Sequence, residues 1–175
     1  MVTRRFGESQ PPGTRGVVFV HSAPAALCPH IEWAIGSVLG SQAHVDWTNQ
    51  PAQRGTLRAE ISWADAAGTG AALASKLAAM QRVRFEVTEE PTTGTEGHRY
   101  AWTPTLGMFT ATIGVHGDIM VNEERIKRAV AEDALGRTGL HDALAALLGS
   151  DWDAELDIFR HASEDAPVRW LHQVV

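Results

Sequence analysis

The chain has 175 residues, of which 44% are hydrophobic and 21% are charged, so it can bury a core and global disorder is excluded. Its net charge is −6 and it has no dense stripe of Lys and Arg, which argues against nucleic-acid binding and against polybasic contact with a membrane surface. Cys28 is the single cysteine, so an internal disulfide is not possible. No apolar run approaches the roughly 20 residues that a membrane-spanning helix needs. Arg4-Arg5 resembles the start of an export signal, but the apolar run of such a signal does not follow. We therefore expect a cytoplasmic protein without a membrane anchor.

The first half of the chain predicts six elements after a leader at residues 1–15, in the order strand, helix, strand, strand, helix, strand. Apolar and polar residues alternate from Leu57 to Trp63, which indicates a strand with one buried face. The predicted strands are 16–20, 43–48, 57–63 and 83–87, and the predicted helices are 29–40 and 68–80. This order is typical of a ferredoxin-like βαββαβ module, which we place at residues 16–90.

The second half, residues 98–175, predicts a further α+β module. A hairpin is expected from residue 100 to 115, and Asn122 is placed to cap a helix that has acidic residues in its first turn. A second helix follows from about 138 to 149. Residues 152–159 fit a helix or a strand, and 168–174 fit a final strand. The expected fold class is thus α+β, a ferredoxin-like half packed against a ββαα(α/β)β half, as one compact unit.

The predicted helix at 29–40 carries an unusual outer face. Ile31 and Ile35 lie on the face expected to cover the sheet, whereas Trp33, Gly36 and Gly40 lie opposite. One interpretation is that the second half of the chain covers this face. The other is that it is a partner-binding or self-association surface.

The segment from His21 to His30 is the best candidate for chemistry. It places His21, Ser22, Cys28 and His30 between a strand and the start of a helix, whose N-terminus could lower the pKa of the thiol. A buried, inert cysteine is the favoured interpretation. His116 and Asp118 could complete a small-molecule site. Paired spacing typical of a structural zinc site is absent, so we expect no metal and no cofactor.

Two further features have ordinary explanations. Gly68 and Gly70 stand at the opening of a helix, but no Walker lysine follows, so a turn is favoured over a phosphate cradle. Arg125, Lys127 and Arg128 share a predicted helix with acidic residues. A salt-bridged solvent face is favoured there, and a dock for an acidic partner is the alternative.

Three stretches resemble a known family. They read GVVFVHSAPAALCPHIEWA at 16–34, RFEVTEEP at 84–91 and PVRWLH at 167–172, and they are similar to an uncharacterised actinobacterial family, domain of unknown function 3145. The likeness runs from residue 1 to the C-terminus. It implies no activity, but genes of this family often lie beside those of type II fatty-acid synthesis, which implies a link to that pathway.

These observations favour a non-catalytic cytoplasmic binding, regulatory or accessory protein, linked by the resemblance to fatty-acid or acyl-CoA metabolism. Its expected partner is a protein or a second copy, held through Trp33, Gly36, Gly40, Arg125 and Arg128. Two alternatives stay open. One is a small-molecule-binding enzyme that uses the His21–His30 segment with His116 and Asp118, and the other is a homo-oligomeric structural module.

Overall fold

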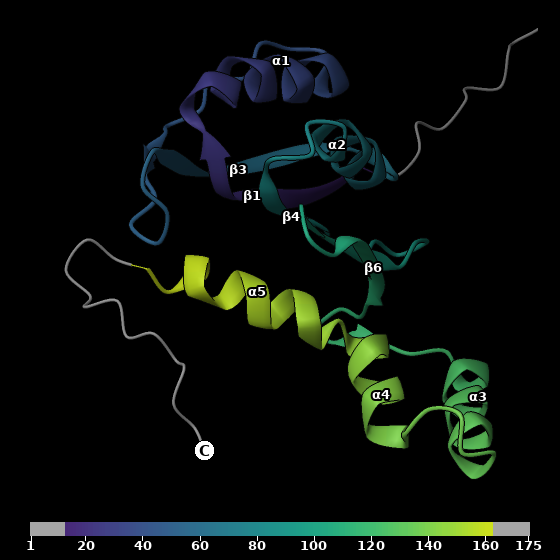
Figure 1. The fold of residues 1–175 in the computed structure, drawn as a ribbon. Helices are drawn as coiled ribbons and strands as arrows, with labels where there is room; N and C mark the ends of the chain where they lie inside the picture. The colour runs from purple at the N-terminus through teal and green to yellow at the C-terminus, as the bar shows by residue number, and fades with distance from the viewer. Residues whose placement is uncertain (1–12, 163–175) are drawn as a thin grey trace, which may run out of the picture.

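The computed structural model describes residues 13–162 and has an α+β fold. One antiparallel sheet has the strand order β2-β3-β1-β4-β5-β6-β7, and five α-helices accompany it (Figure 1). The strands are β1 (Gly13–Pro24), β2 (Thr48–Asn49), β3 (Thr56–Ala66), β4 (Arg84–Glu89), β5 (Gly97–Thr103), β6 (Gly107–Ile113) and β7 (Ile119–Met120). The helices are α1 (Cys28–Leu39), α2 (Thr69–Ala78), α3 (Glu123–Ala134), α4 (Leu140–Leu148) and α5 (Ser150–Arg160), with a 3-10 turn η1 (Ala25–Leu27) before α1.

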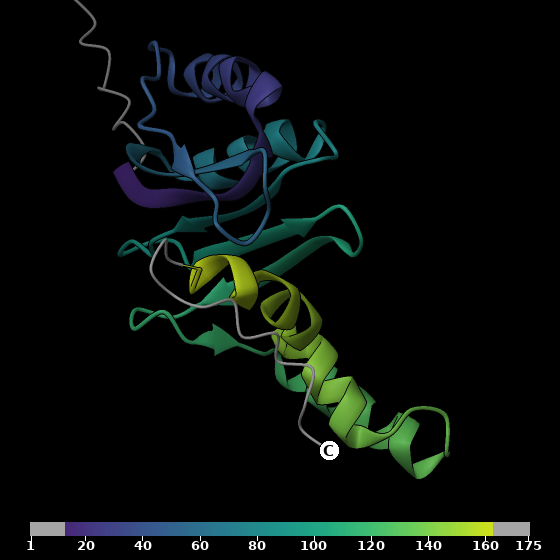
Figure 2. The same cartoon turned by 60° about the vertical axis from the view of Figure 1, so that its left-hand side comes forward.

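The helices α1 and α2 cover one face of the sheet, and α5 crosses the opposite face (Figures 1 and 2). The main core lies under α1 and α2, where apolar side chains of the central strands meet those of both helices. Its fully buried members include Val18, Val20, Ile31, Ile35, Leu73, Leu77, Phe85 and Val87. Burying each such side chain contributes about 1.5–3 kcal/mol to the stability of the fold.

Strand β1 lies inside the sheet, between β3 and β4, and its side chains alternate between the two faces. Val18 pairs with Ile61 of β3 and faces the helical core, whereas Phe19 pairs with Glu60 on one side and Glu86 on the other. Because side chains alternate along a strand, Phe19, Glu60 and Glu86 all point to the second face. That face is therefore partly aromatic and partly charged.

The N-terminus of α2 is closed by a carboxylate from the sheet. Glu89, almost fully buried at the end of β4, accepts hydrogen bonds from the backbone N–H groups of Gly68 and Gly70, both at 2.7 Å. A side chain on Gly70 would lie 2.8 Å from that carboxylate. The predicted turn is thus present, and Glu89 occupies the place where an anion would bind a helix N-terminus.

The second half of the chain extends the sheet and then leaves it. Phe109 and Ala111 of β6 pack on Leu156 of α5, and Trp152 donates a hydrogen bond to the carbonyl of Gly107 at 2.9 Å. Figures 1 and 2 show α3 and α4 projecting away from the body as a helical hairpin, joined to α5. We call this hairpin, residues 123–148, the arm. Within the described residues, no helix is both long and apolar enough to cross a membrane.

Several predicted boundaries are wrong. The first strand runs from residue 13 to 24, so it includes both the end of the expected leader and the start of the expected loop at residues 21–30. The strand expected at 43–48 is reduced to Thr48–Asn49, because β2 pairs with β3 at two positions only. Residues 152–159 belong to the helix α5. The strand expected at 168–174 lies outside the described residues.

Candidate functional site

A buried cluster of charges joins α5 to the second face of the sheet. Glu86 of β4 accepts hydrogen bonds from Arg99 of β5 and Arg160 of α5, the shortest at 2.7 Å in each case. Both guanidinium groups also bind Asp153 of α5, at 2.6 and 2.8 Å. The imidazole Nε2 of His21 lies 2.7 Å from Glu86. Two carboxylates and two guanidinium groups therefore balance one another beneath α5.

The electrostatics fix the protonation state of Glu86. Burial alone would raise its pKa, but hydrogen bonds from His21 and Arg160, together with their charges, hold the pKa well below its usual range. The carboxylate is therefore ionised and can only accept hydrogen bonds, so the Nε2 of His21 is the donor. Glu86 is poorly suited to general acid–base chemistry, which needs a pKa near the working pH.

A cleft of about 620 Å³ opens beside this cluster, on the part of the second face that α5 leaves uncovered. Its walls combine aromatic rings with charged groups. They comprise Phe19 and His21 of β1, Arg58 and Glu60 of β3, Asp46 of the loop before β2, and Phe159 and Arg160 of α5. The ring of His21 stacks on that of Phe19 with centroids 6.0 Å apart. A cleft of this size and mixed lining is typical of a ligand-binding site.

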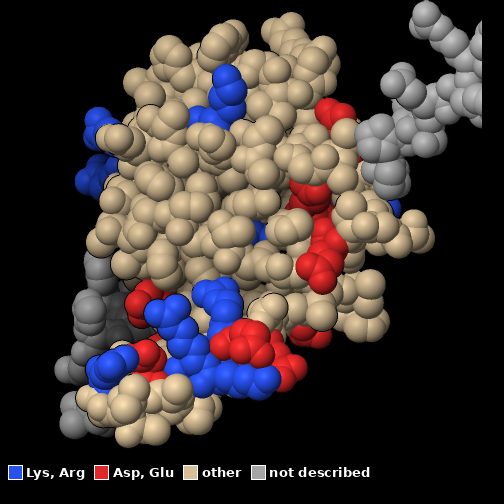
Figure 3. All heavy atoms as spheres, turned by 90° about the vertical axis from the view of Figure 1, so that its right-hand side faces the viewer, with Lys and Arg blue, Asp and Glu red and all other residues tan. Residues whose placement is uncertain are grey.

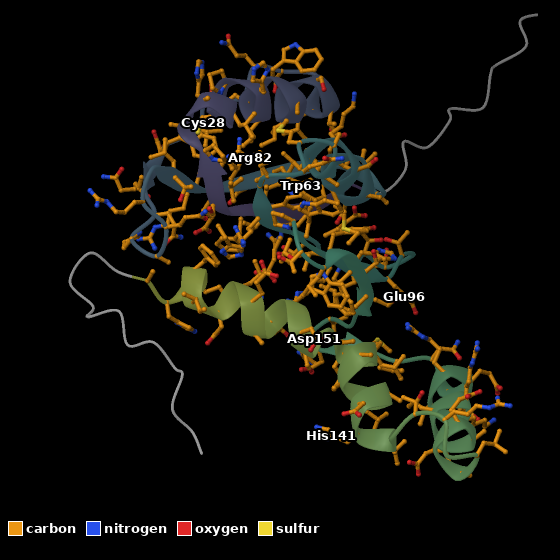
Figure 4. The ribbon with its side chains drawn as sticks, in the orientation of Figure 1. Cys28, Trp63, Arg82, Glu96, His141 and Asp151 are labelled. Atoms are coloured by element: carbon orange, nitrogen blue, oxygen red, sulfur yellow. The ribbon has the colours of Figure 1, made fainter. Side chains whose placement is uncertain are left out.

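The residues proposed from the His21–His30 segment do not converge. His21 reaches the cleft, but Ser22 donates a hydrogen bond to Gln53 at 2.6 Å, and His30 is exposed on α1. Cys28 lies at the start of α1, across the sheet from α5 (Figure 4). It is buried, and burial raises the pKa of its thiol. The alternative of a lowered pKa is therefore wrong, and Cys28 is buried as the favoured interpretation has it, because desolvation of the thiolate and the nearby charge of Glu32 both raise the pKa.

His116 and Asp118 lie in the turn between β6 and β7, far from His21. Strand β6 is the third strand along from β1, which at about 4.8 Å per strand places this turn roughly 14 Å or more away. Both residues are exposed. Within residues 13–162, no group of three or more His, Cys, Asp or Glu side chains is arranged to hold a metal ion.

Within the described residues, the second half of the chain does not cover the outer face of α1. Trp33 is 71% exposed and borders a shallow groove of about 520 Å³, which also includes Gly36 and Gly40. For the described residues, the interpretation that the second half packs here is wrong, because they extend the sheet as β5, β6 and β7, cross its opposite face as α5 and form the arm. Gly36 is closely approached by the loop after α1, since a Cβ there would lie 2.7 Å from the carbonyl oxygen of Ser41.

The basic residues of α3 divide into two kinds. Lys127 binds Glu123 and Glu124, as expected for a salt-bridged solvent face. In the described part of the chain, no ion pair involves Arg125 or Arg128, and both border a shallow hollow of about 290 Å³ between α3 and α4. Figure 3 shows Lys and Arg side chains gathered at this end of the molecule, with acidic side chains beside them.

Sequence reasoning missed the charge cluster. Glu86 alternates with the buried Phe85 and Val87, so the pattern alone assigns it to solvent. Its real environment depends on α5 crossing that face. The available signal was weak: Arg99 and Arg160 are charged residues within otherwise amphipathic elements, but nothing in their spacing indicates a common partner.

One comparison with known proteins gives a match. A family model described as "Protein of unknown function (DUF3145)" matches residues 17–173, nearly the whole chain. No curated protein and no solved structure matches.

Proposed function

We propose a function for this chain from the premise that it belongs to the DUF3145 family, whose activity is unknown. We infer a non-catalytic cytoplasmic protein that binds an acidic partner protein through the arm. We also infer that its N-terminal half is a ferredoxin-like module. That inference is supported by the run β2-β3-β1-β4, in which every neighbouring pair is antiparallel.

The observation that carries the proposal is the exposed apolar surface of the arm. Ile126 and Val130 of α3 are exposed, as are Leu135 just after α3 and Leu148 of α4. Ala129 is the single buried residue within α3 and α4. Helices of 12 and 9 residues are marginal on their own and normally depend on packing for stability. A projecting hairpin that leaves its apolar side chains in solvent is best explained by a partner that covers them.

The charges of the arm select the class of partner. Arg125 and Arg128 lie three residues apart, beside the apolar surface. The nearby acidic residues Glu123 and Glu124 form their ion pairs with Lys127 and not with these two arginines. Two guanidinium groups that have no ion pair within residues 13–162, next to apolar side chains, suit carboxylate-bearing helices of an acidic protein. The link to fatty-acid metabolism implied by the resemblance makes acyl carrier protein the first partner to test.

Non-catalytic binding is favoured over catalysis because the buried charges are already satisfied. Glu86, Arg99 and Arg160 bind one another, and the thiol of Cys28 is protonated at neutral pH. Among the described residues that line the cleft there is no Ser, Cys or Lys side chain that could act as a nucleophile.

The test is a titration of purified acyl carrier protein into the full chain, followed by calorimetry. The double variant Arg125→Glu/Arg128→Glu should weaken binding by about tenfold or more, and binding should weaken as salt is raised. The matched control Lys127→Gln removes a charge that is already paired and should leave the affinity almost unchanged. If the carrier does not bind, and a native-lysate pull-down at physiological salt recovers no stoichiometric partner, the proposal is contradicted.

A homo-oligomer remains the second candidate, and the exposure of Trp33 favours it. An indole 71% exposed beside a groove is suited to self-association. Light scattering of the full chain and of Trp33→Ala separates the two candidates. A dimer that dissociates on substitution supports self-association, and a wild-type monomer excludes it.

A further inference from the structure

The walls of the cleft on the second face of the sheet are held in place by contacts between β1 and α5. The buried side chain of Gln50 donates hydrogen bonds to the carbonyl of His21 at 2.6 Å and to the carbonyl of Phe159 at 3.3 Å. The guanidinium group of Arg84 lies over the ring of Phe159, 4.8 Å from its centroid, and supports that ring. A cleft with fixed walls loses less conformational entropy when it binds a ligand. It is separate from the arm, so ligand binding there is independent of the proposed function.

Aromatic surface covers part of the cleft. The rings of Phe19 and His21 project from the same face of β1 and are nearly parallel, with an angle of 11° between them. Phe159 of α5 adds a second phenyl ring, and both phenylalanines are only partly buried. An apolar group that binds against these rings removes them from water, and an aromatic group adds favourable ring contacts. The lining therefore favours a ligand with an aromatic ring.

The charged side chains that line the cleft fall into two sets. Glu86 and Arg160 bind each other. Asp46, Arg58 and Glu60, in contrast, take part in no ion pair within residues 13–162. Because Arg58 and Glu60 are alternate residues of β3, their side chains leave the same face of the strand roughly 7 Å apart. A cation and two carboxylates thus lie side by side without neutralising one another, which suits a ligand that carries both signs of charge.

Two polar groups of the cleft have hydrogen-bonding capacity left within the described residues. The Nη1 of Arg58 donates to the carbonyl of Ala162 at 2.5 Å, whereas its Nε and Nη2 have no acceptor in that part of the chain. The side chain of His21 is only 8% exposed, and its Nε2 binds Glu86 while its Nδ1 has no partner among residues 13–162. This Nδ1 is not among the fully enclosed atoms without a partner, so it is accessible from the cleft. A buried ring with one open nitrogen indicates a ligand contact at this point.

We propose that the cleft binds a free aromatic α-amino acid. Its carboxylate binds Arg58, whose planar guanidinium group can donate two parallel hydrogen bonds, and its ammonium group binds Glu60 and Asp46. Its ring packs against Phe19, and the Nδ1 of His21 adds one further polar contact. A simple amine would leave Arg58 without a partner, and a simple carboxylate would leave both acidic residues without one. Only a zwitterion satisfies charges of both signs in the same cleft.

A titration of the full chain with three related molecules, followed in its amide spectrum, tests the proposal. L-phenylalanine should bind with a Kd of roughly 1 mM or tighter and should shift the resonances of Phe19, His21, Arg58 and Glu60. The analogues 3-phenylpropionate, which lacks the ammonium group, and 2-phenylethylamine, which lacks the carboxylate, should each bind about tenfold more weakly or worse. Equal affinity for all three molecules overturns the proposal. So does the absence of shifts at these residues with about 10 mM L-phenylalanine.

Variants assign each charge to its ligand group. Arg58→Gln should remove the preference for L-phenylalanine over 2-phenylethylamine and leave the affinity for the amine unchanged. The double variant Asp46→Asn/Glu60→Gln should remove the preference over 3-phenylpropionate. Arg54→Gln, an exposed arginine outside the cleft, is the matched control and should keep both preferences. Variants that keep both preferences overturn the proposed contacts. Where a variant does not fold, the selectivity of the wild type among the three molecules still decides the proposal.

Discussion

Replacing Glu86 by glutamine tests how α5 is held to the sheet. The amide keeps the shape of the carboxylate but removes its charge, and it presents an NH2 group to surroundings made of donors from His21, Arg99 and Arg160. Removing one partner of a buried ionic cluster typically costs 3–5 kcal/mol, and Asp153 still neutralises part of the remaining charge. We therefore expect a loss of about 3 kcal/mol, or roughly 6–12 °C in Tm for a chain of this size.

The stability that Glu86 contributes should also depend on pH, in a direction that its lowered pKa determines. The pKa of Glu86 is lower in the folded chain than its ordinary 4.5, so its contribution is complete above that ordinary value and is lost as the pH falls towards the folded value. The difference in unfolding free energy between wild type and Glu86→Gln should be constant near neutral pH and shrink below about pH 4.5.

Urea unfolding followed by far-UV circular dichroism measures both effects. Glu90→Gln is the matched control, because Glu90 pairs with Arg15 at 2.6 Å on the surface and its loss should be hardly measurable. If the two variants lose equal stability, or if the loss from Glu86→Gln does not change with pH, the cluster does not stabilise the fold through its charges.

Three further predictions concern the other side of the sheet. The variant Gly16→Ala should lower the free energy of unfolding by about 2–3 kcal/mol or more, because the added Cβ would lie 1.8 Å from the carbonyl oxygen of Thr88. The control Gly94→Ala places its Cβ in open space, so its thermal unfolding should be nearly that of the wild type. The variant Glu89→Ala should lower the free energy of unfolding by about 1–3 kcal/mol, because the first backbone N–H groups of α2 lose their acceptor. If unfolding in urea is unchanged, water replaces the carboxylate as the acceptor. Because burial raises the pKa of the Cys28 thiol, the folded protein should react with iodoacetamide at pH 8 more slowly than free cysteine does. In urea the thiol should react at the rate of free cysteine. A fast reaction of the folded protein would contradict the prediction.

Local patterns in the sequence predicted most elements on the covered face of the sheet. The alternation from Leu57 to Trp63 identified β3, and the helical spacing of Ile31 and Ile35 identified the buried face of α1. Asn122 caps α3 as expected, accepting a hydrogen bond from the backbone of Glu124 at 2.8 Å. Each of these features depends on residues close together in the chain, so a single sequence is sufficient to predict them.

The candidate site depends on contacts that no local pattern encodes. His21 and Glu86 are 65 residues apart, and Arg160 lies 74 residues beyond Glu86. Only the path of α5 across the second face brings them together, and that path is set by the packing of Leu156 on β5 and β6. The same path leaves Trp33 exposed and opens the cleft over β1 and β3. Amino-acid order determined the elements and their buried faces, because hydrophobic periodicity is local. Tertiary structure alone decided which charges are buried together and which apolar surfaces stay open, because those depend on how distant elements pack.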